Sequence, residues 1–178
     1  MRGFLILLSV VVVLLSSAVL NSRSPAVAQE ATPAADLEAN KMLAQRFHDE
    51  IFEQGNLAVA DEILAPDFAW FNPPDQADPT TGPEGVKQSA TDVRAFFSDL
   101  VLTDDDVIAE GDRVVLRWTL TGTAQTEAGP VPVRFSGIDI FRIEDGKIAE
   151  LWQLTDDLSL EEQLSAPAAT PAAATPAA

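Results

Sequence analysis

The sequence predicts an α+β domain in which three helices near its N-terminal end pack on one face of a curved, mainly antiparallel sheet. Between residues 37 and 97, apolar residues recur at the spacing of a helix face. From residue 101 the spacing changes to the alternation of a strand, and Asp145-Gly146 between two apolar runs is typical of a β-hairpin turn. Helices followed by a series of strands indicate the α+β class.

Three helical segments are expected: Leu37–Gln54, Leu57–Leu64 and a segment opened by Pro83-Glu84-Gly85. In the first segment, Leu43, Phe47 and Ile51 lie four residues apart and therefore share one face. Asp36 is placed to cap the N-terminus of this helix. Proline suits the first turn of the third helix, where the missing N–H would have no partner in any case.

Five strands are expected, separated by turn residues: Phe68–Phe71, Val101–Glu110, Arg113–Thr121, Val131–Ile143 and Lys147–Thr155. Short connections join the last four strands, so consecutive strands should pair antiparallel. Every even position from Val114 to Leu120 is apolar, which predicts that this face of the strand is buried.

Residues 1–28 have the three parts of a secretory signal peptide. Arg2 supplies a short positive region, residues 4–20 form the apolar segment, and Ala26-Val27-Ala28 is a small-residue cleavage sequence. An uncleaved membrane anchor is the alternative, because the apolar stretch is nearly long enough to cross a bilayer. We predict cleavage between Ala28 and Gln29. The mature protein would then be secreted or held at the cell surface, with no stable membrane anchor.

The segments on either side of the predicted domain are low in sequence complexity. Residues 29–36 and the Ala, Pro and Thr-rich stretch 165–178 cannot bury enough apolar surface to fold, and repeated proline opposes helix formation. We expect a disordered spacer and a disordered tail, with a glycosylated stalk as the alternative reading of such composition. Residues 37–164 then make one domain of ordinary size.

The chain is strongly acidic and contains no cysteine. Its formal charge of −17 becomes −19 when Arg2 and Arg23 leave with the signal peptide. Such a charge repels phosphates and anionic lipid head groups, so nucleic-acid and membrane-surface roles are disfavoured. Without cysteine there are no disulfides and no thiol chemistry, so the core alone must stabilise an exported fold.

Several motifs carry a resemblance to a known family: Gly55–Phe68, Asn72-Pro73, Gly82–Lys87, Phe141–Ile148, and Glu150 with Trp152. In this order they resemble the SnoaL-like polyketide cyclase (ester cyclase) family of the nuclear-transport-factor-2-like superfamily, over nearly all of residues 37–160. The resemblance implies a cone-shaped α+β fold. It is less specific for a reaction, because this fold carries isomerases, dehydratases, cyclases and non-catalytic modules.

The resemblance also implies a pocket for a small hydrophobic carbonyl compound and an aldol-type acid/base reaction that needs no cofactor. The family's carboxylate aligns with Gln153 and its histidine with Asp139, so both positions differ here. In the related ketosteroid isomerases, the general-base Asp aligns with Asn72, the oxyanion-hole Tyr with Phe47, and the protonated Asp with Asp139. Gln153 cannot take up a proton, so the family chemistry is not expected to transfer directly.

Asp139 is the candidate catalytic residue. A carboxyl group between Ile138 and Ile140 in a central strand would be desolvated, which favours its protonated form and suits it to transfer protons near neutral pH. The alternative is a structural aspartate that pairs with an arginine such as Arg117 or bonds to the backbone.

The residues that share a face with Asp139 depend on the hairpin turn. A two-residue Asp145-Gly146 loop pairs Asp139 with Trp152. A three-residue Glu144-Asp145-Gly146 loop with a glycine bulge shifts the pairing by one residue, and the family comparison favours this register. It places Asp139 on the face of Leu151, Gln153 and Thr155.

The predicted substrate-binding residues combine the family comparison with this register: Phe47, Trp70, Asn72, Leu151, Gln153 and Thr155. His48, the single histidine, is expected at the surface, and a lone histidine does not make a metal site. The run 104–106 of three aspartates lacks the spacing of a calcium loop and is interpreted as a solvated, charged edge. Neither a metal nor a cofactor is expected.

Three function classes stay open. The first is an exported acid/base enzyme in which Asp139 moves protons while Gln153, Asn72 and Thr155 orient a small hydrophobic carbonyl compound. The second is a binding module that uses the same pocket without turnover. The third is an oligomeric interaction domain, such as a homodimer through the open face of the sheet.

Overall fold

The computed structural model describes residues 34–166; the predicted signal peptide and most of both predicted disordered segments lie outside this range. The helices are α1 Ala34–Arg46, the π-helix η1 Phe47–Glu53, α2 Val59–Ile63, α3 Gly82–Phe96 and α4 Asp157–Ser165. The strands are β1 Leu64–Phe71, β2 Thr80–Thr81, β3 Phe97–Glu110, β4 Arg113–Thr126, β5 Gly129–Glu144 and β6 Lys147–Thr155. No helix within the described range is long and apolar enough to cross a membrane.

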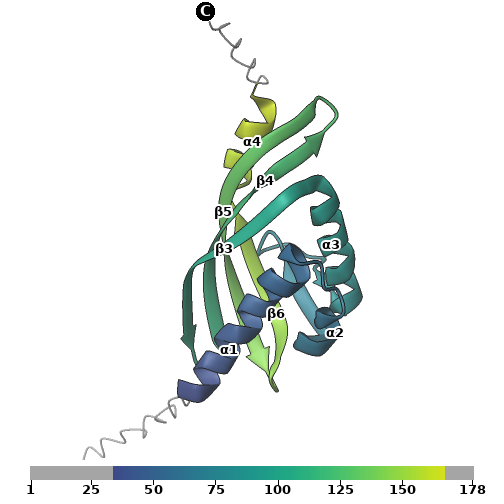
Figure 1. The fold of residues 1–178 in the computed structure, drawn as a ribbon. Coiled ribbons are helices and arrows are strands. Elements are labelled where there is room, and N and C mark those ends of the chain that lie inside the picture. The colour runs from purple at the N-terminus through teal and green to yellow at the C-terminus, as the bar shows by residue number, and fades with distance from the viewer. Residues whose placement is uncertain (1–33, 167–178) are drawn as a thin grey trace, which may run out of the picture. The chain divides into compact units, whose positions relative to one another are not determined.

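The predicted α+β architecture is confirmed. The six strands form one sheet in the order β2-β1-β6-β5-β4-β3, in which β3 to β6 pair antiparallel as their short turns predict and β1 runs parallel to β6. The sheet is curved, and α1, α2 and α3 lie on one side of it (Figure 1). The helices and the inner face of the sheet therefore enclose the core between them.

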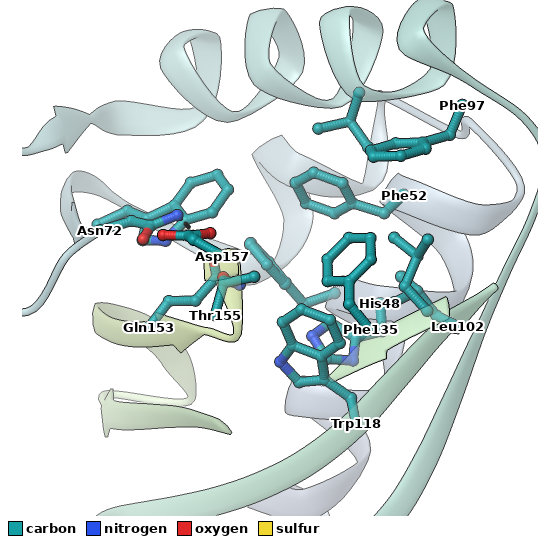
Figure 2. A pocket seen from close by; sticks show the side chains of 14 residues that line it. His48, Phe52, Asn72, Phe97, Leu102, Trp118, Phe135, Gln153, Thr155 and Asp157 are labelled. Atoms are coloured by element: carbon teal, nitrogen blue, oxygen red, sulfur yellow. Dashed lines mark hydrogen bonds between the residues drawn. The ribbon is translucent and has the colours of Figure 1, made fainter. Parts of the chain in front are cut away.

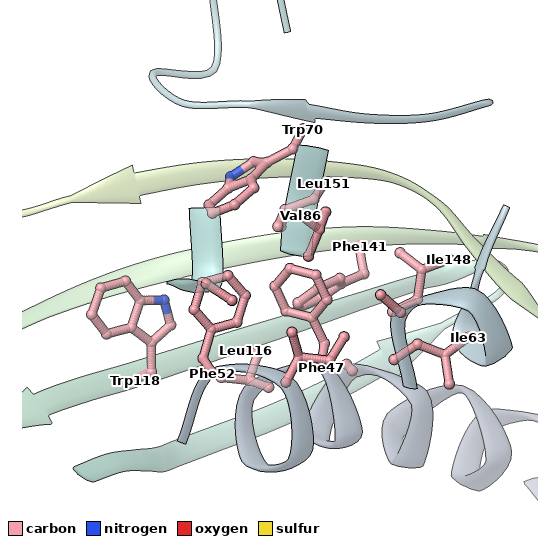
Figure 3. Packing of buried hydrophobic residues seen from close by; sticks show 14 of the residues in the cluster. Phe47, Phe52, Ile63, Trp70, Val86, Leu116, Trp118, Phe141, Ile148 and Leu151 are labelled. Carbon is pink, nitrogen blue, oxygen red and sulfur yellow. The ribbon is translucent and has the colours of Figure 1, made fainter. Parts of the chain in front are cut away.

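The core contains the apolar face that the alternation in β4 predicts. Val114 and Leu116 are fully buried, and Trp118 and Leu120 are nearly so. Figure 3 shows Leu116 and Trp118 beside Phe47 and Phe52 of the helical layer. This packing stabilises the sheet by removing apolar surface from water.

The first predicted helix differs from the structure at both ends. It begins at Ala34, so Asp36 lies inside its first turn and does not cap it. At Phe47 the α-helix becomes a π-helix, whose wider turns bury Phe47, His48, Ile51 and Phe52 together. The prediction that His48 lies at the surface is therefore wrong, because it assumed an α-helical spacing that this segment does not keep.

The hairpin turn also differs from the prediction. Glu144 pairs with Lys147, so the loop is the two-residue Asp145-Gly146, with positive φ at both residues as a type I′ turn requires. The expected three-residue loop is wrong. The pairing instead shifts by one residue further along, where Arg142 pairs with Glu150 and leaves Ala149 as a bulge. This bulge brings Asp139 opposite Gln153, the pairing that the longer loop was expected to produce.

Gly137 of β5 makes room for the side chain of Trp118, its cross-strand partner in β4. A Cβ atom at residue 137 would lie 2.6 Å from Trp118 Cε2 and 2.8 Å from the Leu154 carbonyl oxygen. Only glycine allows the indole to lie this close to the strand.

We expect Gly137→Ala to lower the free energy of unfolding by at least about 2 kcal/mol, because overpacking would displace the indole. Urea denaturation measures this loss. Ser136→Ala, one residue earlier on the opposite face, is the control and should change stability by less than about 0.5 kcal/mol. Equal stability of the two variants would show that Trp118 does not depend on Gly137.

Candidate functional site

A cavity of about 230 Å³ lies between the helices and the inner face of the sheet. Its walls differ in character. One end is aromatic and apolar, with Phe52, Phe97 and Phe135, whereas Asn72, Gln153, Thr155 and Asp157 gather at the other end (Figure 2). The remaining lining residues are Phe47, His48, Trp70, Val93, Leu102, Trp118 and Leu120. The cavity therefore suits a ligand with an apolar body and one polar end.

Asp139 lies behind this wall and is completely buried. Its Oδ1 accepts a hydrogen bond from Trp118 Nε1 at 2.9 Å, and its Oδ2 accepts from His48 Nε2 at 3.0 Å and from Gln153 Nε2 at 3.3 Å. All three donor residues line the cavity, but Asp139 itself does not. This geometry does not support direct proton transfer between Asp139 and a bound ligand, so Asp139 acts on the cavity through its three neighbours.

His48 lies between two carboxylates. Its Nδ1 is 2.9 Å from Asp104 Oδ1, and its Nε2 contacts Asp139. Burial lowers the pKa of His48, but the hydrogen bonds and charges of Asp104 and Asp139 outweigh it and raise the pKa to about 9. The imidazolium is thus the form present near neutral pH, and both of its N–H groups donate to carboxylates. It leaves ring carbons, and no free N–H, for a ligand.

The orientation of the Gln153 amide follows from Asp139. The NH₂ of Gln153 donates to Asp139 Oδ2, so the Gln153 oxygen points the other way and accepts from Asn72 Nδ2 at 2.8 Å. Within residues 34–166, Asn72 Oδ1 and the Thr155 hydroxyl have no hydrogen-bond partner in the protein. A chain of hydrogen bonds from Asp104 to Asn72 therefore orients two amide groups at the cavity, and the Thr155 hydroxyl lines the same end.

Comparison with known proteins decides the family. The family model described as SnoaL-like polyketide cyclase matches residues 42–164, which is most of the chain. The chain belongs to this family. No curated protein matches it. The resemblance inferred from the sequence motifs is thereby confirmed.

Solved structures support the same assignment. TsrD from Streptomyces laurentii is 30% identical, with a TM-score of 0.61 over 72% of this chain and 96% of that chain. A proposed polyketide cyclase from Bacillus cereus is 28% identical, with a TM-score of 0.64 over 75% and 85% of the two chains. IdmH from Streptomyces antibioticus, also a proposed polyketide cyclase, is 27% identical, with a TM-score of 0.60 over 72% and 99%.

The SnoaL-like domain brings most of the sequence-predicted site residues together. Five of the six predicted substrate-binding residues line the cavity: Phe47, Trp70, Asn72, Gln153 and Thr155. Leu151 does not, because it faces the packed core and is fully buried. The expected pairing of Asp139 with Arg117 is not formed, because Arg117 pairs with Asp105 and Asp106.

Sequence reasoning missed His48, Asp104 and Asp157. The π-helix buries two pairs of adjacent residues, Phe47-His48 and Ile51-Phe52, and this spacing in the sequence could have predicted that His48 turns inward. Asp104 was expected in a solvated edge, but a bulge in β3 next to it turns its carboxylate toward His48. Asp157 was missed because no helix was expected after β6.

Among the described residues, no three His, Cys, Asp or Glu side chains form a group that could hold a metal ion.

The ion pairs of His48 make stability depend on pH. Its pKa is about 9 in the folded protein against an ordinary value of 6.5, so protonation favours folding. The contribution, about 3 kcal/mol, is complete below about pH 6.5 and is lost as pH rises through about 9. Urea denaturation of the native protein should show this fall, and His48→Gln, although less stable overall, should not. The same pH dependence in both proteins would remove His48 as its source.

Proposed function

We propose that the domain binds a small hydrophobic carbonyl compound in this cavity. The observation that carries the proposal is the division of one cavity into an aromatic end and a polar end with two oriented amides and a hydroxyl group. Two similar proteins of known structure, from Bacillus cereus and Streptomyces antibioticus, are described as proposed polyketide cyclases, which supports a carbonyl ligand. The apolar body would pack among Phe52, Phe97 and Phe135, and the carbonyl oxygen would accept from the second N–H of Gln153, from Asn72 or from Thr155.

Matched probes test this proposal. By isothermal titration calorimetry, we expect 1-tetralone to bind roughly three- to tenfold tighter than tetralin, the same skeleton without the oxygen, because one hydrogen bond is worth about 1 kcal/mol. Gln153→Leu should abolish the preference. Leu154→Ala, on the opposite face of the same strand, is the control and should retain it. Failure of both probes to bind the native protein would contradict the proposal.

A second candidate is an acid/base enzyme in which Asp157, and not Asp139, carries the proton. Asp157 lines the polar end of the cavity and has no hydrogen bond or ion pair with another residue of the described range. It is the first residue of α4, and the preceding residue, Asp156, caps the helix by accepting from the Ser159 N–H at 3.1 Å. Gln163 of α4 also pairs with the Arg134 backbone at 2.8 Å in both directions.

In this reaction, the Asp157 carboxylate would remove a proton from the carbon next to a carbonyl, and the polar groups would stabilise the enolate. The enolate carbon would form a bond to a second carbonyl of the same molecule, and the resulting alkoxide would regain the proton from Asp157. With heptane-2,6-dione as probe, loss of water then gives a cyclic enone that is followed by its ultraviolet absorbance.

Asp157→Asn should abolish enone formation while leaving the binding of 1-tetralone within about twofold. Asp156→Asn is the matched control, because asparagine caps a helix as well as aspartate does, and it should keep its activity. No turnover by the native protein would reject this candidate and leave the binding proposal standing.

Export and self-association also remain proposals. We infer from the sequence that residues 1–28 are removed, which N-terminal sequencing of the protein recovered from outside the cell would show as a chain starting at Gln29. A chain that keeps Met1 would contradict this.

For the homodimer, the outer face of the sheet offers three exposed apolar residues, Ile138, Ile140 and Leu154. Sedimentation analysis tests this proposal, and a monomer would contradict it.

A further inference from the structure

A second hollow adjoins the cavity. It has a volume of about 340 Å³ and lies between α3 and the chain that joins β1 to β2. Trp70, Asn72 and Val93 belong to the walls of both spaces. The far wall of the hollow is polar, with Thr80, Ser89 and Asp92. The two spaces therefore share one boundary but differ in chemistry.

Trp70 lies on this boundary and has an unsatisfied donor. Its Nε1 is the one buried side-chain nitrogen or oxygen within residues 34–166 that has no hydrogen-bond partner. The side chain is only 8% exposed, so water does not readily compensate the N–H. In Figure 3 the nitrogen lies on the edge of the indole that is turned away from Phe47 and Phe52. A buried N–H without a partner is unfavourable, and a ligand acceptor at this position would remove that cost.

We propose that the cavity and the hollow form one ligand site with two compartments. The site would take a compound with an apolar ring system in the cavity and an uncharged polar arm in the hollow, whose hydroxyl, ether or amide oxygen accepts from Trp70 Nε1. This inference rests on the proposed binding function and narrows the class of ligand. Size supports it, because the cavity alone is smaller than the range of about 300–1,000 Å³ typical of ligand pockets, and the two spaces together lie within it.

The charges around the site define the arm further. No lysine or arginine of the described range lines either space, and both N–H groups of His48 are occupied by carboxylates. Asp92 faces the hollow, where its Oδ1 accepts from Gln88 Nε2 at 2.9 Å, and Asp157 lies at the polar end of the cavity. A carboxylate arm would meet like charges and no cation, and an ammonium arm has no lone pair with which to accept from Trp70 Nε1, so the arm is uncharged.

Three related ketones test the inference by isothermal titration calorimetry: 1-tetralone, its 6-(2-hydroxyethoxy) derivative and its 6-(carboxymethoxy) derivative. The native protein should bind the hydroxyethoxy compound about tenfold tighter than 1-tetralone and the carboxymethoxy compound more weakly than either. Ser89→Met, which fills the hollow from α3, should remove the tenfold gain and leave 1-tetralone unchanged. Methionine suits a helix, and the Ser89 hydroxyl only bonds back to the Gly85 carbonyl, so this variant should fold.

Trp70→Phe provides a second variant, because it removes the N–H and keeps an aromatic ring. It too should remove the gain of the hydroxyethoxy arm. Equal affinity of the armed and unarmed ketones for the native protein, or a gain that survives in Ser89→Met, would overturn the inference while the proposed function stands. Tighter binding of the carboxymethoxy compound would overturn the assignment of an uncharged arm. Failure of 1-tetralone and both derivatives to bind would remove the proposed function and this inference together.

Discussion

The buried carboxylate of Asp139 accepts hydrogen bonds from three side chains that come from three different elements: His48 of η1, Trp118 of β4 and Gln153 of β6. A charge without solvent is costly unless donors surround it, so these elements must keep their positions for the carboxylate to remain satisfied. Three local features bring these donors close to Asp139. The π-helix turns His48 inward, Gly137 admits the Trp118 indole, and the bulge at Ala149 places Gln153 opposite Asp139.

This network also defines what the cavity can do. Asp139 and Asp104 hold His48 as an imidazolium whose N–H groups are both used, so the most basic group of the site has no proton to offer a ligand. The groups of this network that line the cavity are the amides of Gln153 and Asn72, and their hydrogen bonds hold each amide in one orientation. Such preorganised polar groups favour recognition of a ligand oxygen, because little entropy is lost when they bind it.

Relative to the family pattern, charged and uncharged groups have changed places. The resemblance in the sequence implies an acid/base carboxylate after the hairpin tryptophan and a histidine in the preceding strand, whereas this chain has the amide of Gln153 and the carboxylate of Asp139 there. The histidine of this chain is supplied by η1 instead, and it contacts Asp139 directly. Among the described residues that line the cavity, Asp157 on α4 is the one with a carboxylate. Matching sequence positions alone therefore do not assign the reaction of the family to this chain.

The sequence by itself determined the α+β class, the antiparallel meander from β3 to β6, the buried face of β4 and the family, because these depend on local periodicity and turn residues. It also brought five substrate-binding candidates to one cavity through the family comparison. Only the tertiary structure decided the inward turn of His48, the one-residue shift at Ala149 and the placement of Asp157. The first depends on carboxylates more than fifty positions from His48, the second on the pairing of β5 with β6 around Asp139 and Gln153, and the third on how α4 docks; local patterns carry no record of such tertiary contacts.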